Sequence, residues 1–124
     1  MKTIITALAF TLTTVFTIAQ TPSQVEYYDN GKVKAEYFAQ ADGMIDAKFY
    51  YSSGQLREVG QFKDLKRHGA WTSYSRSGDV SAKGTFVEGA KAGVWMFWDF
   101  NGDLSHEVSY EGEKPQLVVH NQEK

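Results

Sequence analysis

The sequence predicts an all-β protein, an elongated single-layer antiparallel sheet of tandem β-hairpin repeats. Two observations support this fold class: a period of 24 residues and a polar-glycine turn pair in every period. After the turns, apolar and polar residues alternate, as in residues 80–86, and this pattern is typical of half-buried strands. We therefore expect a stack of similar hairpins, each burying part of its neighbour.

The period appears in several columns of the sequence. Gly54, Gly78 and Gly102 are 24 residues apart, and Gly31 precedes Gly54 by 23. The other columns, each with a step of 24, are Phe38, Phe62, Phe86 and Tyr110; Trp71 and Trp95; Gly69 and Gly93; and Tyr50, Tyr74 and Trp98. The columns divide the chain into four repeats, at about 24–47, 48–71, 72–95 and 96–114, followed by a tail at 115–124.

The turn pairs indicate where each hairpin closes. They are Asn30-Gly31, Ser53-Gly54, Ser77-Gly78 and Asn101-Gly102. Asn-Gly favours a type I′ turn, because both central residues of that turn have positive φ. A second set of turns lies about half a period away, as at Asp42-Gly43 and Glu111-Gly112, so we expect about eight strands.

The tryptophan column makes a specific packing prediction. Gly60 and Gly84 lie in the middle of predicted strands, where a missing side chain leaves room for the rings of Trp71 and Trp95. Trp71 and Tyr74 have opposite parity, so they point to opposite faces unless a bulge intervenes. The sequence alone does not decide between these two arrangements.

The repeat resembles a known family. The motif Gly69-Ala70-Trp71-x-x-Tyr74 is followed by a polar-glycine turn, by Gly84-x-Phe86 and by Glu88-Gly89-x-Lys91-x-Gly93. This pattern is similar to the bacterial variant of the MORN repeat, in a family often described as antitoxins of toxin-antitoxin pairs. The resemblance covers roughly residues 25 to 114 and implies a sheet of stacked hairpins. Its first and last copies depart from the motif, as expected of capping repeats.

The first nineteen residues are typical of a signal peptide. Lys2 provides a short positive start, an uncharged apolar run follows from Ile4 to Phe16, and Thr17-Ile18-Ala19 places small residues at a cleavage site. The apolar run is shorter than the roughly 20 residues that a membrane-spanning helix needs. We therefore expect a secreted or periplasmic protein that is cleaved after Ala19.

Charge and composition exclude several function classes. Without Lys2 the chain has twelve basic and fifteen acidic residues, a net charge of −3. This charge argues against nucleic acid and against anionic membranes as partners. Cysteine is absent from the sequence, so disulfides, thiolate chemistry and lipid attachment through an N-terminal cysteine are excluded.

The sequence predicts no catalytic residue, no metal site and no cofactor. Glu58 and His106 share a column on the mostly apolar face, but they lie four strands apart, about 19 Å at the usual strand spacing. Asp99, Asn101 and Asp103 resemble the start of a calcium loop, but Leu104 stands where that loop needs glycine. An Asx-rich hairpin turn explains these residues better.

The charged residues 63–68 also have a simple interpretation. Lys63, Lys66, Arg67 and His68 form a small basic patch. In an acidic chain, we interpret this patch as solvated turn charge.

These observations predict a non-enzymatic protein that binds or scaffolds another protein. Met96, Trp98 and Phe100 are the candidate partner-binding residues, because two of their columns carry polar residues in other repeats. Alternation would place all three on one face. The alternative is that Leu117-Val118-Val119 folds back and covers them. Aromatic platforms also leave a glycan- or envelope-binding module as a second function class.

The signal-peptide interpretation makes the first testable prediction. We expect the protein in the envelope or medium of the producing cell to begin at Gln20. Intact-mass spectrometry of that material measures this directly. A species in the envelope that retains Met1 or Lys2 would contradict the predicted cleavage.

Overall fold

The computed structural model describes residues 20–112 and 114–120, so the predicted signal peptide lies outside the described residues. The described chain forms nine strands and no helix, and hence no helix that could cross a membrane. The strands are β1 (Gln24–Tyr27), β2 (Val33–Ala39), β3 (Ile45–Tyr50), β4 (Leu56–Lys63), β5 (Lys66–Tyr74), β6 (Val80–Val87), β7 (Ala90–Trp98), β8 (Leu104–Ser109) and β9 (Gln116–Val119).

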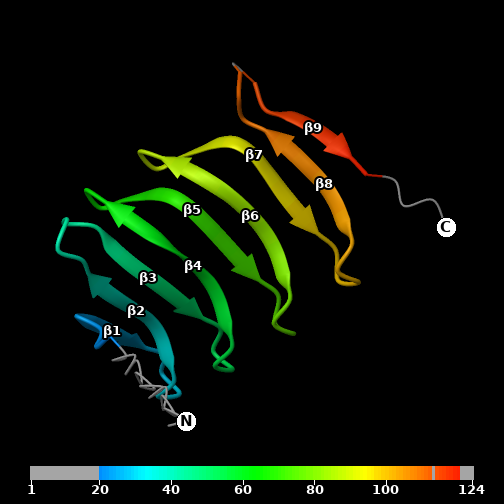
Figure 1. The fold of residues 1–124 in the computed structure, drawn as a ribbon. Coiled ribbons are helices and arrows are strands. Elements are labelled where there is room, and N and C mark those ends of the chain that lie inside the picture. Colours follow the sequence, from blue (N-terminus) through cyan, green and yellow to red (C-terminus); the bar gives the residue numbers. More distant parts are fainter. Residues whose placement is uncertain (1–19, 113, 121–124) are drawn as a thin grey trace, which may run out of the picture.

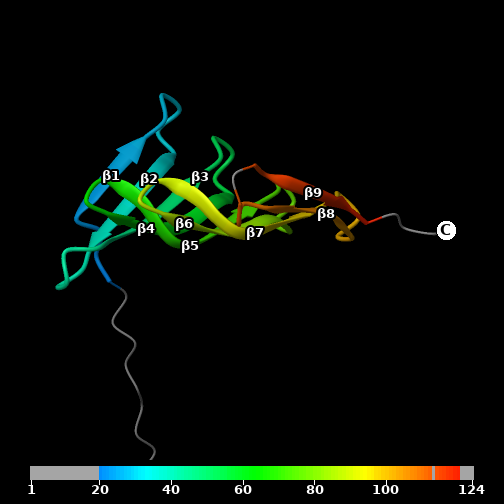
Figure 2. The ribbon, with the colours of Figure 1, turned by 90° about the horizontal axis from the view of Figure 1, so that it is seen from above.

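The strands form one open sheet in which each strand pairs with the next one along the chain. The order runs from β1 to β9 without a crossover, and every pairing is antiparallel (Figure 1). The predicted all-β sheet of tandem hairpins is therefore confirmed. Figure 2 shows that the sheet twists, so that β1 and β2 stand at a steep angle to β8 and β9.

The turn at each polar-glycine pair is a type I turn followed by a bulge, not the type I′ turn expected from the sequence. Gly31, Gly54, Gly78 and Gly102 have positive φ, whereas the residues before them do not. In the third turn Gly78 N–H donates to the Ser75 carbonyl and Ser75 N–H donates to Asp79, as a three-residue loop requires. The register shifts beside these turns, for example between Ser73 and Tyr74.

The turns that join β4 to β5 and β6 to β7 have a different geometry from the polar-glycine turns. Asp64 and Leu65 have φ of 50° and 63°, and Glu88 and Gly89 have φ of 49° and 83°. Consecutive residues with positive φ define a two-residue type I′ turn. The β2–β3 turn on the same border is instead a three-residue loop, because Gln40 N–H donates to the Met44 carbonyl and Gly43 N–H donates to the Gln40 carbonyl. This border therefore mixes two turn geometries.

Three of the four buried rings of the described chain lie on one face, which we call the aromatic face. Trp71, Phe86 and Trp95 form its centre and are 2%, 9% and 5% exposed. A Cβ atom added to Gly60 would overlap the Trp71 ring, and one added to Gly84 would overlap the Trp95 ring. The prediction that these glycines make room for the indoles is confirmed. The β4–β5 and β6–β7 registers shift at these same glycines.

Tyr74 belongs to the other face of the sheet, which we call the polar face. Tyr50 is 24 residues before Tyr74, and its hydroxyl donates a hydrogen bond to the Glu36 carboxylate. Glu36 precedes Tyr37, whose ring meets Phe49 on the aromatic face, so Glu36 and Tyr50 lie on the polar face. The alternation of the strand, rather than a bulge, accounts for the opposite parity of Trp71 and Tyr74.

Phe38 does not share the environment of Phe62, although the two are 24 residues apart. Phe38 pairs with Asp46, and Lys48 lies 5.4 Å from the centre of its ring, on the polar face. Phe62 instead packs against Trp71 on the aromatic face. The reason is the 23-residue step from Gly31 to Gly54, which reverses the parity of the first repeat, so assigning Phe38 to this column was wrong.

The C-terminal segment extends the sheet instead of remaining a tail. β9 pairs with β8 through residue pairs that include His106 with Val119 and Val108 with Leu117. Leu117, Val118 and Val119 are 62%, 52% and 59% exposed. The expectation of eight strands was therefore short by one.

The contact between tryptophan and glycine makes a stability prediction. We expect Gly84→Ala to lower the free energy of unfolding by about 1–3 kcal/mol, because the added methyl group must displace the Trp95 ring. Lys83→Ala, on the polar face of the same strand, is the control and should change stability by less than about 0.5 kcal/mol. Denaturant unfolding measures both. Equal stability of Gly84→Ala and the parent would rule out the close approach.

Candidate functional site

A continuous row of rings crosses the aromatic face. The consecutive centroid distances lie between 4.6 and 6.4 Å. In chain order the members are Tyr37, Phe49, Phe62, Trp71, Phe86, Trp95, Phe97 and His106. Most neighbouring rings meet edge to face, an arrangement that favours the ring quadrupoles.

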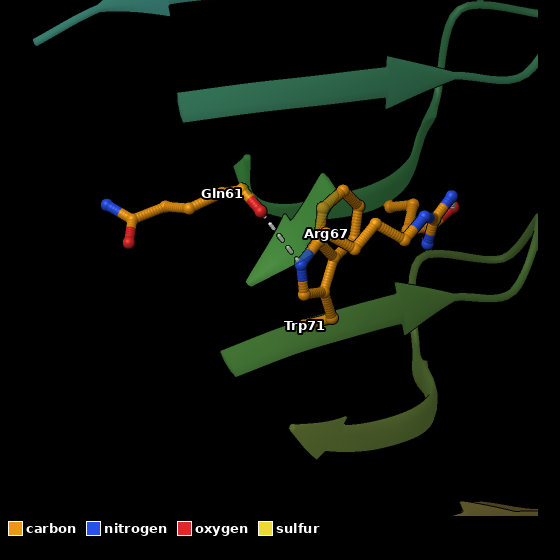
Figure 3. A network of polar contacts seen from close by, with 4 residues as sticks. Gln61, Arg67 and Trp71 are labelled. Atoms are coloured by element: carbon orange, nitrogen blue, oxygen red, sulfur yellow. Dashed lines mark hydrogen bonds and ion pairs between the residues drawn. The ribbon is translucent and has the colours of Figure 1, made fainter. Parts of the chain in front are cut away.

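Arginine 67 covers the centre of this row. Its guanidinium lies 4.1 Å from the centre of the Trp71 ring and 5.5 Å from that of Phe86, and it forms an ion pair with Glu58. The Trp71 indole N–H donates to the Gln61 carbonyl at 3.2 Å, and Figure 3 shows Arg67 beside this ring. Stacking and charge pairing together fix the guanidinium in place.

The same arrangement recurs one repeat later with lysine. The Lys91 ammonium lies 4.9 Å from the Trp95 ring centre and 5.6 Å from that of Tyr110. The Trp95 indole N–H donates to the Thr85 carbonyl at 3.1 Å. The sheet therefore places a cation over Trp71 and over Trp95, the two tryptophans of the aromatic face.

Arg67 corrects the interpretation of the basic patch as solvated turn charge. Its side chain is only 35% exposed and lies in β5, paired with Glu58. The signal in the sequence was available, because Arg67 and Lys91 are 24 residues apart, each four residues before a tryptophan. That column of cations was missed.

The two residues considered as a catalytic pair have separate partners. Glu58 in β4 pairs with Arg67, whereas His106 in β8 stacks on Phe97 with a centroid distance of 4.6 Å. Three strands separate β4 from β8, which confirms the expected separation. No direct contact between the two side chains is possible over this distance.

The acidic turn at 99–103 has the geometry of an Asx turn. One Asp99 carboxylate oxygen accepts the N–H groups of Asn101 at 2.9 Å and Asp103 at 3.1 Å. This oxygen therefore organises its own backbone, as the hairpin interpretation predicts. Within residues 20–112 and 114–120, no cluster of three side chains suited to hold a metal ion occurs.

The candidate partner-binding residues lie near the C-terminal end of the sheet. Met96 and Trp98 are half-buried in β7, and their parity is opposite to that of Trp95 and Phe97. Phe100 lies beyond the end of β7, in the turn, and is 92% exposed. Strand alternation therefore applies to Met96 and Trp98 but not to Phe100.

The alternative that the C-terminal segment covers these residues does not match the structure. Met96 pairs with Glu107, and Glu107 pairs with Val118, so β9 lies beside β8 in the plane of the sheet. A strand in that position does not cover Met96. Lys83 and Glu107 flank Met96 on its two sides.

Residues 23–40, 46–64 and 67–88 match the family model of the MORN repeat variant. This is a MORN-repeat protein. The matched segments correspond to the hairpins β1–β2, β3–β4 and β5–β6 of the MORN sheet. β7–β8 has the same glycine turn, and Trp95 in it repeats the contact of Trp71, so the structure extends the MORN pattern to a fourth hairpin. No curated protein gives a significant match to the chain.

The polar face contains a tyrosine with a strongly shifted pKa. Burial, together with the hydrogen bond to Glu36 and its negative charge, raises the pKa of Tyr50 to about 12. The unfolded chain loses this proton near pH 10, whereas the folded chain keeps it to about pH 12. The stabilising contribution is therefore complete below pH 10 and disappears as the pH rises to about 12.

This shift makes a pH-dependent prediction. Tyr50→Phe should be less stable than the parent at pH 8, and the difference should shrink at pH 11, because only the parent loses the contribution of the protonated phenol. Thermal melts at the two pH values measure it. Tyr27→Phe, in which the exposed ring of β1 is changed, is the control. A difference that does not vary with pH would contradict the assigned role of Glu36.

Proposed function

We propose that this chain is an exported, non-enzymatic module that binds or scaffolds a protein partner. Repeats of this type are often protein- or membrane-binding modules. The observation that carries the proposal is Phe100, a large apolar side chain that is 92% exposed in a turn. Met96 and Trp98, half-buried in the preceding strand, provide adjoining apolar surface.

The exposure of Phe100 has no explanation in the packing of the repeat. Arg76 occupies the same turn position one repeat earlier, and its guanidinium lies 4.6 Å from the centre of the Tyr51 ring. Ser75 lies 24 residues after Tyr51, so it is the residue that Phe100 would contact in the same way. Serine has no ring on which Phe100 could stack. An aromatic side chain that its own fold does not use favours a role in recognition.

The non-enzymatic part of the proposal rests on the side chains that chemistry would need. Glu58 is engaged by Arg67, and the His106 ring is stacked on Phe97. Export is supported by residues 1–19, which have the charge, apolar run and small residues of a signal peptide. An antitoxin-like role would be a narrower form of this proposal, with a toxin as the protein partner.

A glycan-binding module is the second candidate class. Flat aromatic rings open to solvent favour sugar binding, but Trp71 and Trp95 are buried beneath Arg67 and Lys91. The observations therefore favour a protein partner over a glycan. Pull-down from an envelope extract and binding to a glycan array distinguish the two classes.

The proposed surface is tested by Met96→Lys combined with Phe100→Arg. Lysine and arginine already occur at the equivalent positions of other repeats, as Lys48 in the Met96 column and Arg76 in the Phe100 column. We expect the pulled-down partner to be lost while the melting temperature stays unchanged, because neither side chain belongs to the buried core. Quantitative mass spectrometry of the captured material and a thermal melt measure the two effects.

Thr72→Lys is the matched control, because it adds a charge in the Met96 column one repeat earlier. It should leave capture of the partner intact. A large fall in the melting temperature of the double variant would mean that the surface is part of the core. Retained capture would place the partner elsewhere.

A further inference from the structure

A hollow of about 470 Å³ opens on the aromatic face at the N-terminal end of the sheet. Its walls include Glu26 of β1, Tyr37 of β2, Ile45 of β3 and Phe62 of β4, and Leu65 forms part of its rim. Its residues come from β1 to β4, from Ser23 just before β1 and from the turn after β4. Figure 1 shows β1 at the opposite edge of the sheet from β9. The hollow combines two aromatic rings, two aliphatic side chains and one carboxylate with the polar side chains of Ser23 and Gln24.

Elsewhere on the aromatic face, pairs of neighbouring rings each hold a cationic side chain. Arg67 lies over Trp71 and Phe86, and Lys91 lies over Trp95 and Tyr110. The residue 24 positions before Arg67 is Gly43, which lies in a turn and has no side chain. The chain therefore supplies no cation of this column to the rings beside the hollow.

The hollow contains a carboxylate that lacks a cationic partner. Glu26 is half-buried, and no ion pair to it occurs in the part of the chain that the structure describes. Its charge and hydrogen bond act on Tyr37, whose pKa is raised by burial and then by Glu26. By contrast, Glu58 in β4 has its charge balanced by Arg67.

Leu65 is held in an unfavourable conformation without being buried. Its φ is 63°, in the left-handed region where a branched, bulky side chain is rare, and it is 88% exposed. The same turn position in the following repeat is Gly89, with φ of 83°. Glycine would close this turn without strain, so the leucine serves something other than the hairpin.

We propose that this hollow binds an arginine side chain of a partner protein. The guanidinium lies over the rings of Tyr37 and Phe62 and pairs with Glu26, and Leu65 packs against the aliphatic stem. A planar guanidinium suits this site better than an ammonium, because it stacks on rings and donates two parallel hydrogen bonds to a carboxylate. The site goes beyond the Met96 and Phe100 surface and provides a second contact at the other end of the sheet.

The test uses two probes that differ in charge but hardly in shape. Nα-acetyl-arginine methylamide and its uncharged citrulline analogue are titrated into the protein, followed by the backbone amide signals in NMR. We expect shifts centred on Tyr37, Phe62 and Leu65, and an affinity for the arginine probe higher by about fivefold, as for a partly exposed ion pair. Glu26→Gln should remove this preference. No shift at the hollow, or equal affinity of the two probes for the parent, would overturn the proposal.

Leu65→Gly provides a second, independent measurement. It should raise the melting temperature, because it relieves the strained φ, and it should weaken binding of the arginine probe. A rise in melting temperature with unchanged affinity would overturn the role of Leu65. The Met96→Lys, Phe100→Arg variant should bind the probe like the parent, so failure at the hollow and failure of the C-terminal surface can be told apart.

Discussion

The sheet depends on an indole ring that lies over a glycine of the neighbouring strand. A single-layer sheet has no second layer to cover its apolar side chains, so it must bury them within its own surface. Gly60 and Gly84 provide the depressions, and Trp71 and Trp95 fill them so closely that no Cβ atom would fit. Each indole N–H then reaches a backbone carbonyl of the same neighbouring strand, which satisfies its only donor.

The ends of the molecule are where this packing stops. Ala47 occupies the tryptophan position in the first repeat, and Val108 and Leu117 continue the row beyond Trp95. The central repeats cover their rings with Arg67 and Lys91, whereas the first leaves a hollow and the last leaves Phe100 exposed. Both proposed recognition surfaces therefore lie toward the two ends of the sheet.

The period of the sequence was sufficient to predict the hairpins, the fold class and the place of the tryptophans, because each depends on local turns and alternation. It failed at Phe38, since one residue fewer in the first repeat reverses the face of every later side chain in that strand. Arg67 and Lys91 also follow the period, but the period does not show that Arg67 pairs with Glu58, nine residues away across a hairpin. The hollow beside Glu26 could not be predicted, because it is shaped by four strands together.

The border with the four polar-glycine loops has one backbone geometry throughout, whereas the opposite border combines type I′ turns at 64–65 and 88–89 with a three-residue loop at 40–44. A type I′ turn restricts both of its central residues, whereas the three-residue loops constrain only their glycine. The pairs at 29–30, 52–53, 76–77 and 100–101 read Asp-Asn, Ser-Ser, Arg-Ser and Phe-Asn, a range of charge and size on one backbone. Successive loops are two strands apart, about 10 Å. The border with these loops thus presents a regularly spaced row of side chains that can be replaced. New binding specificity can arise there without a change in the sheet.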